Sequence, residues 1–332
     1  MSTYITLSHI HVQNANCVAG ITYGFPAVTQ FLGYVHALSR KLQHTHNLTL
    51  NGCAIVCHHY QIHAYRPRRE FYFYQTKNPA AFPYQEKNIG GDSPIVEEGK
   101  MHLTVSLIIE CEGFKGGEAD KKTLVHHISQ LGLVHKLAGG VITQIKEVIL
   151  ETVMDDSGFR RIRRRLMPGF ILMDRSEHLF EHLQTLKEQK NPNAEMLDAW
   201  LDFSARQYKA VPVLEKDETL SMETKANWEY KASTQFPGWL VPITIGYRAI
   251  SELYDAGIVA NTRDPSVPFC FTEAVYSIGE WLSPHRINDL RQVIWRYAQP
   301  EQGWYLCKQT INTIQEVGNE VEDEMDQYIF GD

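Results

Sequence analysis

The most regular alternation of apolar and polar residues in the chain lies between Lys100 and Cys111. One face of this segment is apolar and carries Met101, Leu103, Val105, Leu107, Ile109 and Cys111. The other face is polar and carries Lys100, His102, Thr104 and Ser106. A period of two residues is typical of a β-strand. We therefore expect a strand with one buried face and one open polar face.

The first 42 residues predict a strand, a polar loop and an amphipathic helix. In the strand Tyr4–Val12 the buried phase changes once near Ser8–His9, and a β-bulge commonly causes such a change. Gln13–Phe25 is predicted as a loop rich in amides and glycine. The helix that follows has one apolar stripe, formed by Val28, Phe31, Leu32, Val35, Leu38 and Leu42. Its N-terminus suits a phosphate, although an ordinary strand–loop–helix corner has the same pattern.

The order of predicted elements in residues 1–150 is β-α-β, an insertion, then β-α-β. The further elements are a strand within 51–65, a helix at about 119–134 and a strand at 141–150, and the insertion covers 66–99. This order is the ferredoxin-like pattern, in which two helices cover one face of an antiparallel sheet. RNA-recognition modules use the open face of such a sheet, but the fold hosts many other functions. The predicted class is therefore α+β with a ferredoxin-like palm.

The remainder of the chain divides into three predicted segments. Residues 151–235 are predicted to be mainly helical, with a loop at 211–232. Residues 236–310 form an aromatic-rich C-terminal block that we expect to pack on the palm, with a helix that begins at Ser283 and Pro284 and continues to Ile294. Residues 311–332 form an acidic tail.

Charge and cysteine content limit the classes of protein. The net charge of the 332 residues is −7, and residues 316–332 contribute seven acids with no lysine or arginine, so the rest of the chain is formally neutral. The body can therefore carry a basic face despite the negative total. Six scattered cysteines favour a reducing compartment. No apolar run has membrane-spanning length and the N-terminus lacks a secretory pattern, so we expect a cytoplasmic protein without a membrane partner.

The most basic segment of the chain is Asp155–Phe170. Phe159, Ile162 and Leu166 have the spacing of an amphipathic helix that ends at Pro168-Gly169. The remaining positions place five guanidiniums around its exposed side, namely Arg160, Arg161, Arg163, Arg164 and Arg165. Such a helix is a concentrated phosphate-binding surface. Two alternatives remain open, a solvated face neutralised by neighbouring acids and a contact with an acidic protein.

Motifs of common enzyme and cofactor sites are absent from the sequence. There is no Walker loop, no dinucleotide-binding glycine fingerprint and no nucleophile elbow. Fifteen histidines are present, but no cysteine or histidine set has zinc-finger spacing, so neither a metal nor a cofactor is expected. Histidine-assisted cleavage of RNA on the open sheet stays chemically possible.

Several stretches, taken in order, are similar to one family. They are QNAN at 13–16, YGFPAVTQFLGYVHAL at 23–38, GCAIVCHHYQ at 52–61, IVEEGKMHLTVSLII at 95–109, LAGGVI at 137–142, RRLMPGF at 164–170, PGWLVPITIGY at 237–247 and GEWLSPHR at 279–286. The chain resembles the second subunit of the Csy complex, the type I-F CRISPR surveillance complex. The resemblance runs from about residue 4 to residue 305 and excludes the acidic tail.

The resemblance implies a fold and a role. The family is part of the RAMP superfamily, so a ferredoxin-like (RRM/RAMP) palm with a helical, thumb-like elaboration is expected. The implied role is non-catalytic: the subunit grips the 5′ handle of the CRISPR RNA (crRNA), and a different subunit cuts the precursor. The implied partners are the large subunit, the first subunit of the repeating backbone and, indirectly, target DNA. The alternative is an endoribonuclease of the same superfamily that processes repeat RNA.

RNA contact is carried over to residues that match the family's motifs. The amides Gln13, Asn14 and Asn16 are expected to read bases, and the five arginines are expected to bind phosphates and make binding salt-dependent. His285 and Arg286 complete the predicted RNA-binding set. The amides have a structural alternative, since they are also suited to closing a turn on the backbone. The aromatics of the C-terminal block are expected in the core or a subunit interface.

Overall fold

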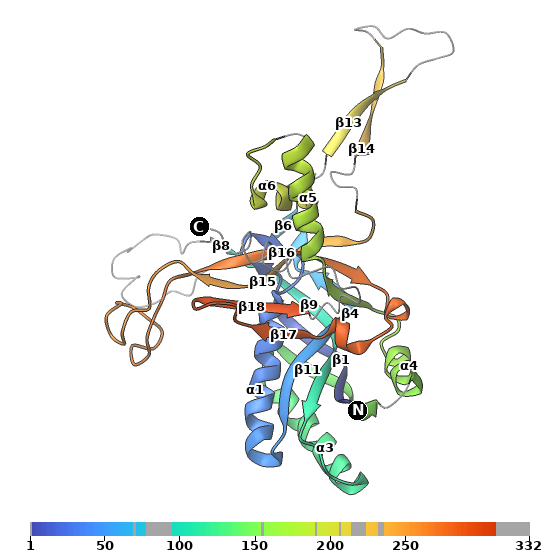
Figure 1. The fold of residues 1–332 in the computed structure, drawn as a ribbon, viewed down its shortest axis with the longest axis vertical. Coiled ribbons are helices and arrows are strands. Elements are labelled where there is room, and N and C mark those ends of the chain that lie inside the picture. The colour runs from blue at the N-terminus through green and yellow to red at the C-terminus, as the bar shows by residue number, and fades with distance from the viewer. Residues whose placement is uncertain are drawn as a thin grey trace. The chain divides into compact units, whose positions relative to one another are not determined.

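The computed structural model describes residues 2–68, 71–77, 95–153, 156–189, 191–205, 207–213, 224–231 and 236–309 (Figure 1). The predicted acidic tail and most of the predicted insertion lie outside these residues. Two compact units are present. The first lies within Met1–Leu172, Ile243–Tyr276 and Leu282–Ile311, and the second lies within Met173–Pro242 and Ser277–Trp281.

The first unit contains the two strands that were predicted at Lys100–Cys111 and Tyr4–Val12. β9 (Lys100–Glu112) buries the predicted apolar face completely or nearly so. β1 (Ser2–Asn16) has a register shift between Leu7 and Ile10 where it pairs with β9, and His9 has a φ of 48°. The predicted bulge is therefore confirmed. The predicted loop beginning at Gln13 is wrong in its first residues, because pairing with the neighbouring strands extends β1 through Asn16.

Four long antiparallel strands form the central sheet of this unit. Their order is β11 (Gly140–Val153), β1, β9 and β4 (Thr49–Ile62), and β10 (Lys136–Leu137) pairs with the start of β11. α1 (Val28–His46) joins β1 to β4 and packs on β4, while α3 (Glu118–Val134) joins β9 to β11 and packs on β11. The two helices also touch each other (Figure 1). Assignment of this arrangement to the ferredoxin-like RAMP palm stays a prediction.

The apolar stripe of α1 forms much of the core between helix and sheet. Phe31, Leu38 and Leu42 are 0–1% exposed, and full burial of each such side chain stabilises the fold by about 1.5–3 kcal/mol. The helix ends at Asn47, whose left-handed backbone (φ 53°) lets its N–H bond the carbonyl of Gln43.

Strands of the C-terminal block extend the sheet of the first unit. β17 (Trp295–Ala298) pairs with β4 and with β18 (Trp304–Gln309), which also pairs with β15 (Leu240–Ala249). The carbonyl of Leu172, in β12 (Phe170–Asp174), accepts hydrogen bonds from Trp295 Nε1 at 3.1 Å and Gln309 Nε2 at 3.0 Å. β16 covers Thr272–Leu282.

The helix predicted from Ser283 to Ile294 is wrong. Two short 3₁₀ helices, η1 (Pro284–Arg286) and η2 (Leu290–Val293), take its place. Asp289 between them has extended backbone, and its side chain accepts the N–H of Arg291 at 2.9 Å. This local bond starts a new turn, which prevents a continuous helix.

The second unit contains α5 (Ser176–Gln189), α6 (Met196–Ser204) and the hairpin of β13 (Gln207–Pro212) and β14 (Ala226–Lys231). α5 and α6 lie in the segment that was predicted to be mainly helical. The predicted loop at 211–232 is wrong for its described residues, because cross-strand pairs such as Tyr208 with Tyr230 hold a hairpin. The predicted division of the chain into four segments stays a prediction, and α4 (Asp156–Arg165) lies in the first unit.

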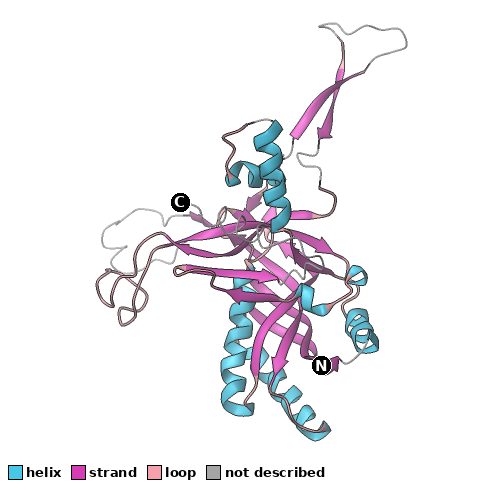
Figure 2. Ribbon diagram, in the orientation of Figure 1, coloured by secondary structure: helices cyan, strands magenta, loops and turns pink. Residues whose placement is uncertain are grey.

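The first unit also contains short paired strands. They are β2 (Val18–Ala19), β3 (Thr22–Tyr23), β5 (Ala64–Tyr65), β6 (Tyr72–Phe73), β7 (Gln75–Lys77) and β8 (Ile95–Glu97). Helices and strands are mixed in both units, and one large sheet is antiparallel throughout its recorded pairings (Figure 2). None of the helices in the described ranges is both long and apolar enough to cross a membrane.

Candidate nucleic-acid interface

The helix α4 presents arginines to solvent because its apolar residues are fixed on the protein. Ile162 and, one residue beyond the helix, Leu166 are each 1% exposed, and α4 packs against β11. Of the five predicted arginines, Arg163 is half-buried. The other four are exposed, namely Arg160, Arg161, Arg164 and Arg165. The predicted amphipathic helix is therefore present, with its guanidiniums on the outer side.

One carboxylate of the sheet binds two of these guanidiniums. Glu151 on β11 accepts Arg161 Nε at 2.6 Å through Oε1 and Arg165 NH1 at 3.2 Å through Oε2. Part of the charge of α4 is therefore neutralised within the chain, as the solvated-face alternative requires. Arg164 is exposed and has no ion-pair partner among the described residues.

Arg163 connects α4 to the turn that holds His285 and Arg286. Its guanidinium carbon lies 5.5 Å from the ring centroid of Phe159. Its NH1 donates to the carbonyl of His285 at 3.4 Å and to that of Ile287 at 3.5 Å. His285 and Arg286 are exposed. The structure therefore brings the predicted arginines and the predicted η1 residues onto one surface.

The predicted amides lie at the end of β1 and have different surroundings. Gln13 and Asn14 are exposed, and Asn14 has a φ of 55°. Asn16 is bound more tightly: its Oδ1 accepts Lys100 Nζ at 2.9 Å and its N–H donates to the carbonyl of Ala138 at 2.8 Å. Two amides are thus available to a ligand, whereas the third supports the local structure.

The amides and the arginine helix lie at opposite ends of β1. Tyr4 pairs with Glu151, the residue that binds α4, and Gln13 pairs with Val141. Nine residues of strand at about 3.3 Å each separate these two points by about 30 Å. The structure therefore does not bring the two predicted groups together, and a single nucleotide cannot contact both.

A histidine pair that the sequence did not single out lies between these ends. The rings of His9 and His58 stack with centroids 4.0 Å apart and an interplanar angle of 11°. Ser106 Oγ accepts the N–H of His9 at 2.9 Å and lies 2.7 Å from His58 Nε2, while His58 Nδ1 lies 2.6 Å from the carbonyl of Pro168. Because a carbonyl only accepts, Nδ1 donates and Nε2 accepts from the serine.

This bonding makes His58 a brace for the turn after α4. Burial lowers the pKa of His58, and nearby Lys146 lowers it further, while the bond to Pro168 opposes this shift. Burial, then His58, lower the pKa of His9. Both nitrogens of His58 are therefore hydrogen-bonded within the chain. The phase change at Ser8–His9 and the motif GCAIVCHHYQ at 52–61 include these two histidines, but neither feature indicated that the rings stack.

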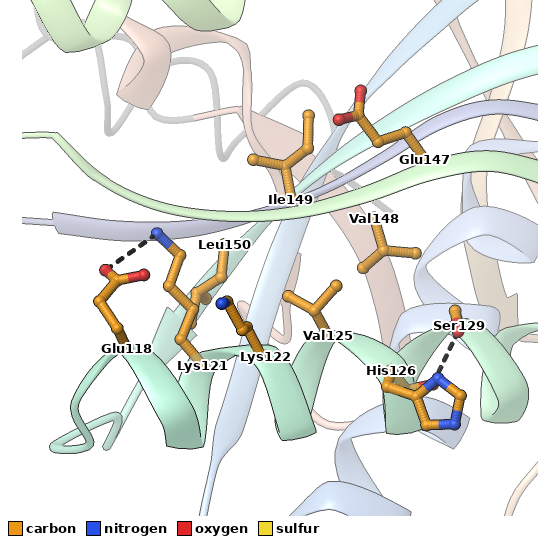
Figure 3. Close-up of a pocket in the computed structure, with 10 residues that line it drawn as sticks. All are labelled: Glu118, Lys121, Lys122, Val125, His126, Ser129, Glu147, Val148, Ile149 and Leu150. Carbon is orange, nitrogen blue, oxygen red and sulfur yellow. Dashed lines mark hydrogen bonds and ion pairs between the residues drawn. The ribbon is translucent and has the colours of Figure 1, made fainter.

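A cavity elsewhere in the first unit contains none of the predicted RNA-binding residues. A cavity of about 430 Å³ lies between α3 and β11, with Val125, Val148 and Leu150 on its walls and the ion pair of Lys121 with Glu118 at 3.6 Å beside it (Figure 3). None of the predicted RNA-binding residues lines it. Among the described residues, no group of three or more His, Cys, Asp or Glu side chains is placed to hold a metal ion.

Comparison with known proteins gives a consistent result over nearly the whole chain. The family described as CRISPR-associated protein (Cas_Csy2) matches residues 5–307. The CRISPR-associated protein Csy2 of Pseudomonas aeruginosa (strain UCBPP-PA14) is 34% identical over 317 residues, which cover 91% of this chain and 93% of that protein. The match ends before the acidic tail. The chain therefore belongs to the Cas_Csy2 family and is a Csy2 subunit of the type I-F CRISPR complex.

Proposed function

We propose that this subunit binds the 5′ handle of the crRNA without cutting it. In the assembled complex it pairs with the large subunit and contacts the first subunit of the repeating backbone, and it meets target DNA only indirectly. The observation that carries the proposal is the exposed guanidinium surface of α4, which extends to Arg286 through the contact of Arg163 with η1. Clustered arginines bind closely spaced phosphates through charge and paired N–H donors.

The fold supports a single-stranded RNA as ligand. The strand order β11-β1-β9-β4 with α1 and α3 as connections agrees with a ferredoxin-like palm of the RAMP superfamily. Such palms leave a polar sheet face open, and here the half-buried Lys100, His102 and Thr104 of β9 lie on that face, whereas Ser106 on the same face is fully buried. The predicted thumb-like elaboration corresponds to residues 151–235.

The competing function is cleavage of repeat RNA, and the histidine geometry favours the non-catalytic role. His58 Nδ1 is bonded to the carbonyl of Pro168 and its Nε2 to Ser106, whose side chain is fully buried, so the proton-accepting nitrogen is directed at the protein interior. Purified chain incubated with repeat RNA is expected to leave the RNA intact. Cleavage that disappears in H9N or H58N protein would establish the endoribonuclease instead.

The salt dependence of RNA binding tests the arginine surface. We expect R160Q/R164Q protein to bind single-stranded handle RNA more weakly. The magnitude of the slope of log K against log [salt] should fall by about 1.4, because each phosphate that is no longer bound on a single strand lowers it by about 0.7. The matched control is K121Q/K122Q, which removes the same charge from α3, and its slope should match wild type. An unchanged slope in R160Q/R164Q would remove α4 from the RNA site.

A protein adaptor is the remaining alternative, in which the arginines meet acids of the large subunit. Photoreactive handle RNA in the assembled complex distinguishes the two. An RNA-binding subunit gives an adduct on α4 or η1, whereas an adaptor gives none on this chain.

A further inference from the structure

Five rings form a continuous row that starts beside the predicted amides. We call them the aromatic ladder: His102, His63, Tyr74, Tyr65 and Tyr72. Successive ring centroids are 4.2, 5.9, 6.1 and 5.9 Å apart. The ring of Tyr65 is tilted by 35° from that of Tyr72 and by 34° from that of Tyr74. The ring of His63 lies 24° from that of Tyr74, whereas the ring of His102 is edge-on to His63 at 83°. The row therefore begins with an edge-on contact at His102 and continues through four rings that are tilted by about 24–35° from one to the next.

Backbone pairing places the ladder on one face of a hairpin. Tyr65 pairs with Tyr72 in β5 and β6, and the carbonyl of His63 accepts the N–H of Tyr74 at 3.1 Å. Side chains alternate between the two faces of a strand. Ala64 and Phe73 therefore point to the opposite face, which leaves the tyrosines together.

The tyrosines of the ladder are open to solvent. Tyr65, Tyr72 and Tyr74 are 44%, 38% and 54% exposed. Single exposed apolar side chains are common, but a contiguous exposed patch commonly marks a binding site. Burial, with a smaller contribution from His102, lowers the pKa of His63, so its ring is neutral at pH 7 and can stack without desolvating a charge.

Hydrogen bonds connect the ladder to the amide end of β1. The N–H of Asn14 donates to His102 Nδ1 at 3.4 Å. Lys100 binds Asn16 Oδ1 through Nζ and accepts the N–H of His63 at 2.9 Å through its carbonyl. The exposed amides of Gln13 and Asn14 and the exposed rings are therefore parts of one continuous surface at the end of the palm sheet.

We propose that the aromatic ladder stacks unpaired bases of single-stranded RNA next to the amides that read them. Aromatic faces accept any base, and amides supply the donors and acceptors that distinguish bases. The inference rests on the proposed RNA-binding function and adds a second contact region about 30 Å from the arginine helix. It requires the RNA to run across the open end of the sheet.

Charge around the ladder favours RNA over an apolar protein partner. Arg66 lies over the ring of Phe71 at 5.2 Å, Arg68 is exposed, and Lys100 sits beside the first rings. Two exposed acids also lie beside the ladder: Glu97 at the end of β8 and Glu98 after it accept hydrogen bonds from Gln75 and Thr76 of β7, and the N–H of Glu98 donates to the carbonyl of Tyr74 at 3.1 Å. The three cations outnumber these two acids among the described residues. Rings interleaved with cations are the usual composition of a single-strand binding surface.

Conservative tyrosine variants separate ring stacking from the other contacts. In Y65L/Y74L the apolar volume remains but the ring faces are lost, so affinity for handle RNA should fall about tenfold or more for each stacked base. The salt slope should not change, because no phosphate contact is removed. Y65F/Y74F keeps the rings and should bind like wild type. RNA with 2-aminopurine at single positions should be quenched by wild type and by Y65F/Y74F, but not by Y65L/Y74L.

A measurement on the unaltered full-length chain covers the case in which the leucine variant fails to fold. Handle RNA carrying 5-iodouridine is irradiated with the wild-type chain, and the adducts are mapped. Adducts on Tyr65, Tyr72 or Tyr74 support the ladder. Adducts confined to other residues overturn it. It is also overturned if Y65L/Y74L binds RNA with wild-type affinity but no longer binds the large subunit. Ladder adducts together with an unchanged salt slope in R160Q/R164Q would retain the ladder and reject the arginine site.

Discussion

Arg161 Nε lies 2.6 Å from Oε1 of Glu151, so the most basic helix of the chain is tied to the sheet by its own counter-charge. The arginine is 55% exposed and the glutamate 14% exposed, measured on their side chains. A phosphate that approaches α4 must therefore compete with a carboxylate for Arg161 and for Arg165. Surface ion pairs of this kind contribute little to stability, so the pair should influence RNA affinity more than folding.

The first prediction is that E151Q strengthens RNA binding. Without the carboxylate, a phosphate no longer competes with Glu151 for Arg161 and Arg165, while glutamine keeps the size of the side chain. Affinity for single-stranded RNA should rise at low salt, and the log–log salt slope should steepen by about 0.7 for each additional phosphate that is bound. The unfolding free energy should change by about 1 kcal/mol or less. Binding is measured by fluorescence anisotropy across a salt series.

Glu147 supplies the matched control for this prediction. It is exposed on the same strand, and no ion pair with an arginine is recorded for it in the described part of the chain. E147Q makes the same change of net charge, so it should leave the salt slope at the wild-type value. Equal effects of E151Q and E147Q would mean that total charge, rather than the loss of the carboxylate that binds α4, controls RNA binding.

The second prediction separates the amide of Asn14 from its backbone. Asn14 has a φ of 55°, a conformation that glycine adopts without strain and alanine does not. N14G should fold with a stability close to wild type and lose about 1–3 kcal/mol of base discrimination, because one amide contact is removed. N14A should lose the same discrimination and also about 1 kcal/mol of stability.

Competition between handle RNAs that differ at one base measures this discrimination, and chemical unfolding measures stability. Unlike the arginine variants, N14G should keep the wild-type salt slope. If N14G still prefers the natural handle by the wild-type factor, the amide of Asn14 does not read the handle.

Local patterns in the sequence predicted the elements in which apolar side chains repeat with a regular period. Strict alternation predicted β9, and one change of phase near His9 predicted the bulge of β1. The apolar stripe predicted α1. The 3₁₀ turns near Asp289 and the hairpin of Tyr208 and Tyr230 were missed, because a single side-chain bond and cross-strand contacts decide them.

The candidate site was predictable in its residues but not in its arrangement. Spacing alone placed the arginines on the outer side of α4. Their partner Glu151 lies on another element, and the brace between His58 and Pro168 joins residues 110 positions apart. The distance of about 30 Å between the amides and the arginines follows from the pairing of β1 with β11, which is a tertiary property.

The third prediction concerns pH and the brace at His58. Burial holds the pKa of His58 below the ordinary value of 6.5, with Lys146 of β11 lowering it further, while the stacked His9 of β1 titrates beside it. The folded chain therefore holds His58 neutral at pH values where the unfolded chain would protonate it. By linkage, the stability that this group contributes is present above pH 6.5 and is lost as pH falls from 6.5 toward the lowered pKa.

H58N should remove this dependence, because asparagine retains one donor near Pro168 and cannot be protonated. At pH 7.5 the variant should be less stable by about 1 kcal/mol, since the bond to Ser106 is lost. Between about pH 7.5 and 5.5 its unfolding free energy, measured in urea by tryptophan fluorescence, should decline less than that of wild type. H36N, on the exposed side of α1, is the control and should follow wild type. If the unfolding free energy declines equally in H58N and wild type, protonation of His58 does not cause the pH dependence. Other groups would then cause it, and His9 would be the first to test.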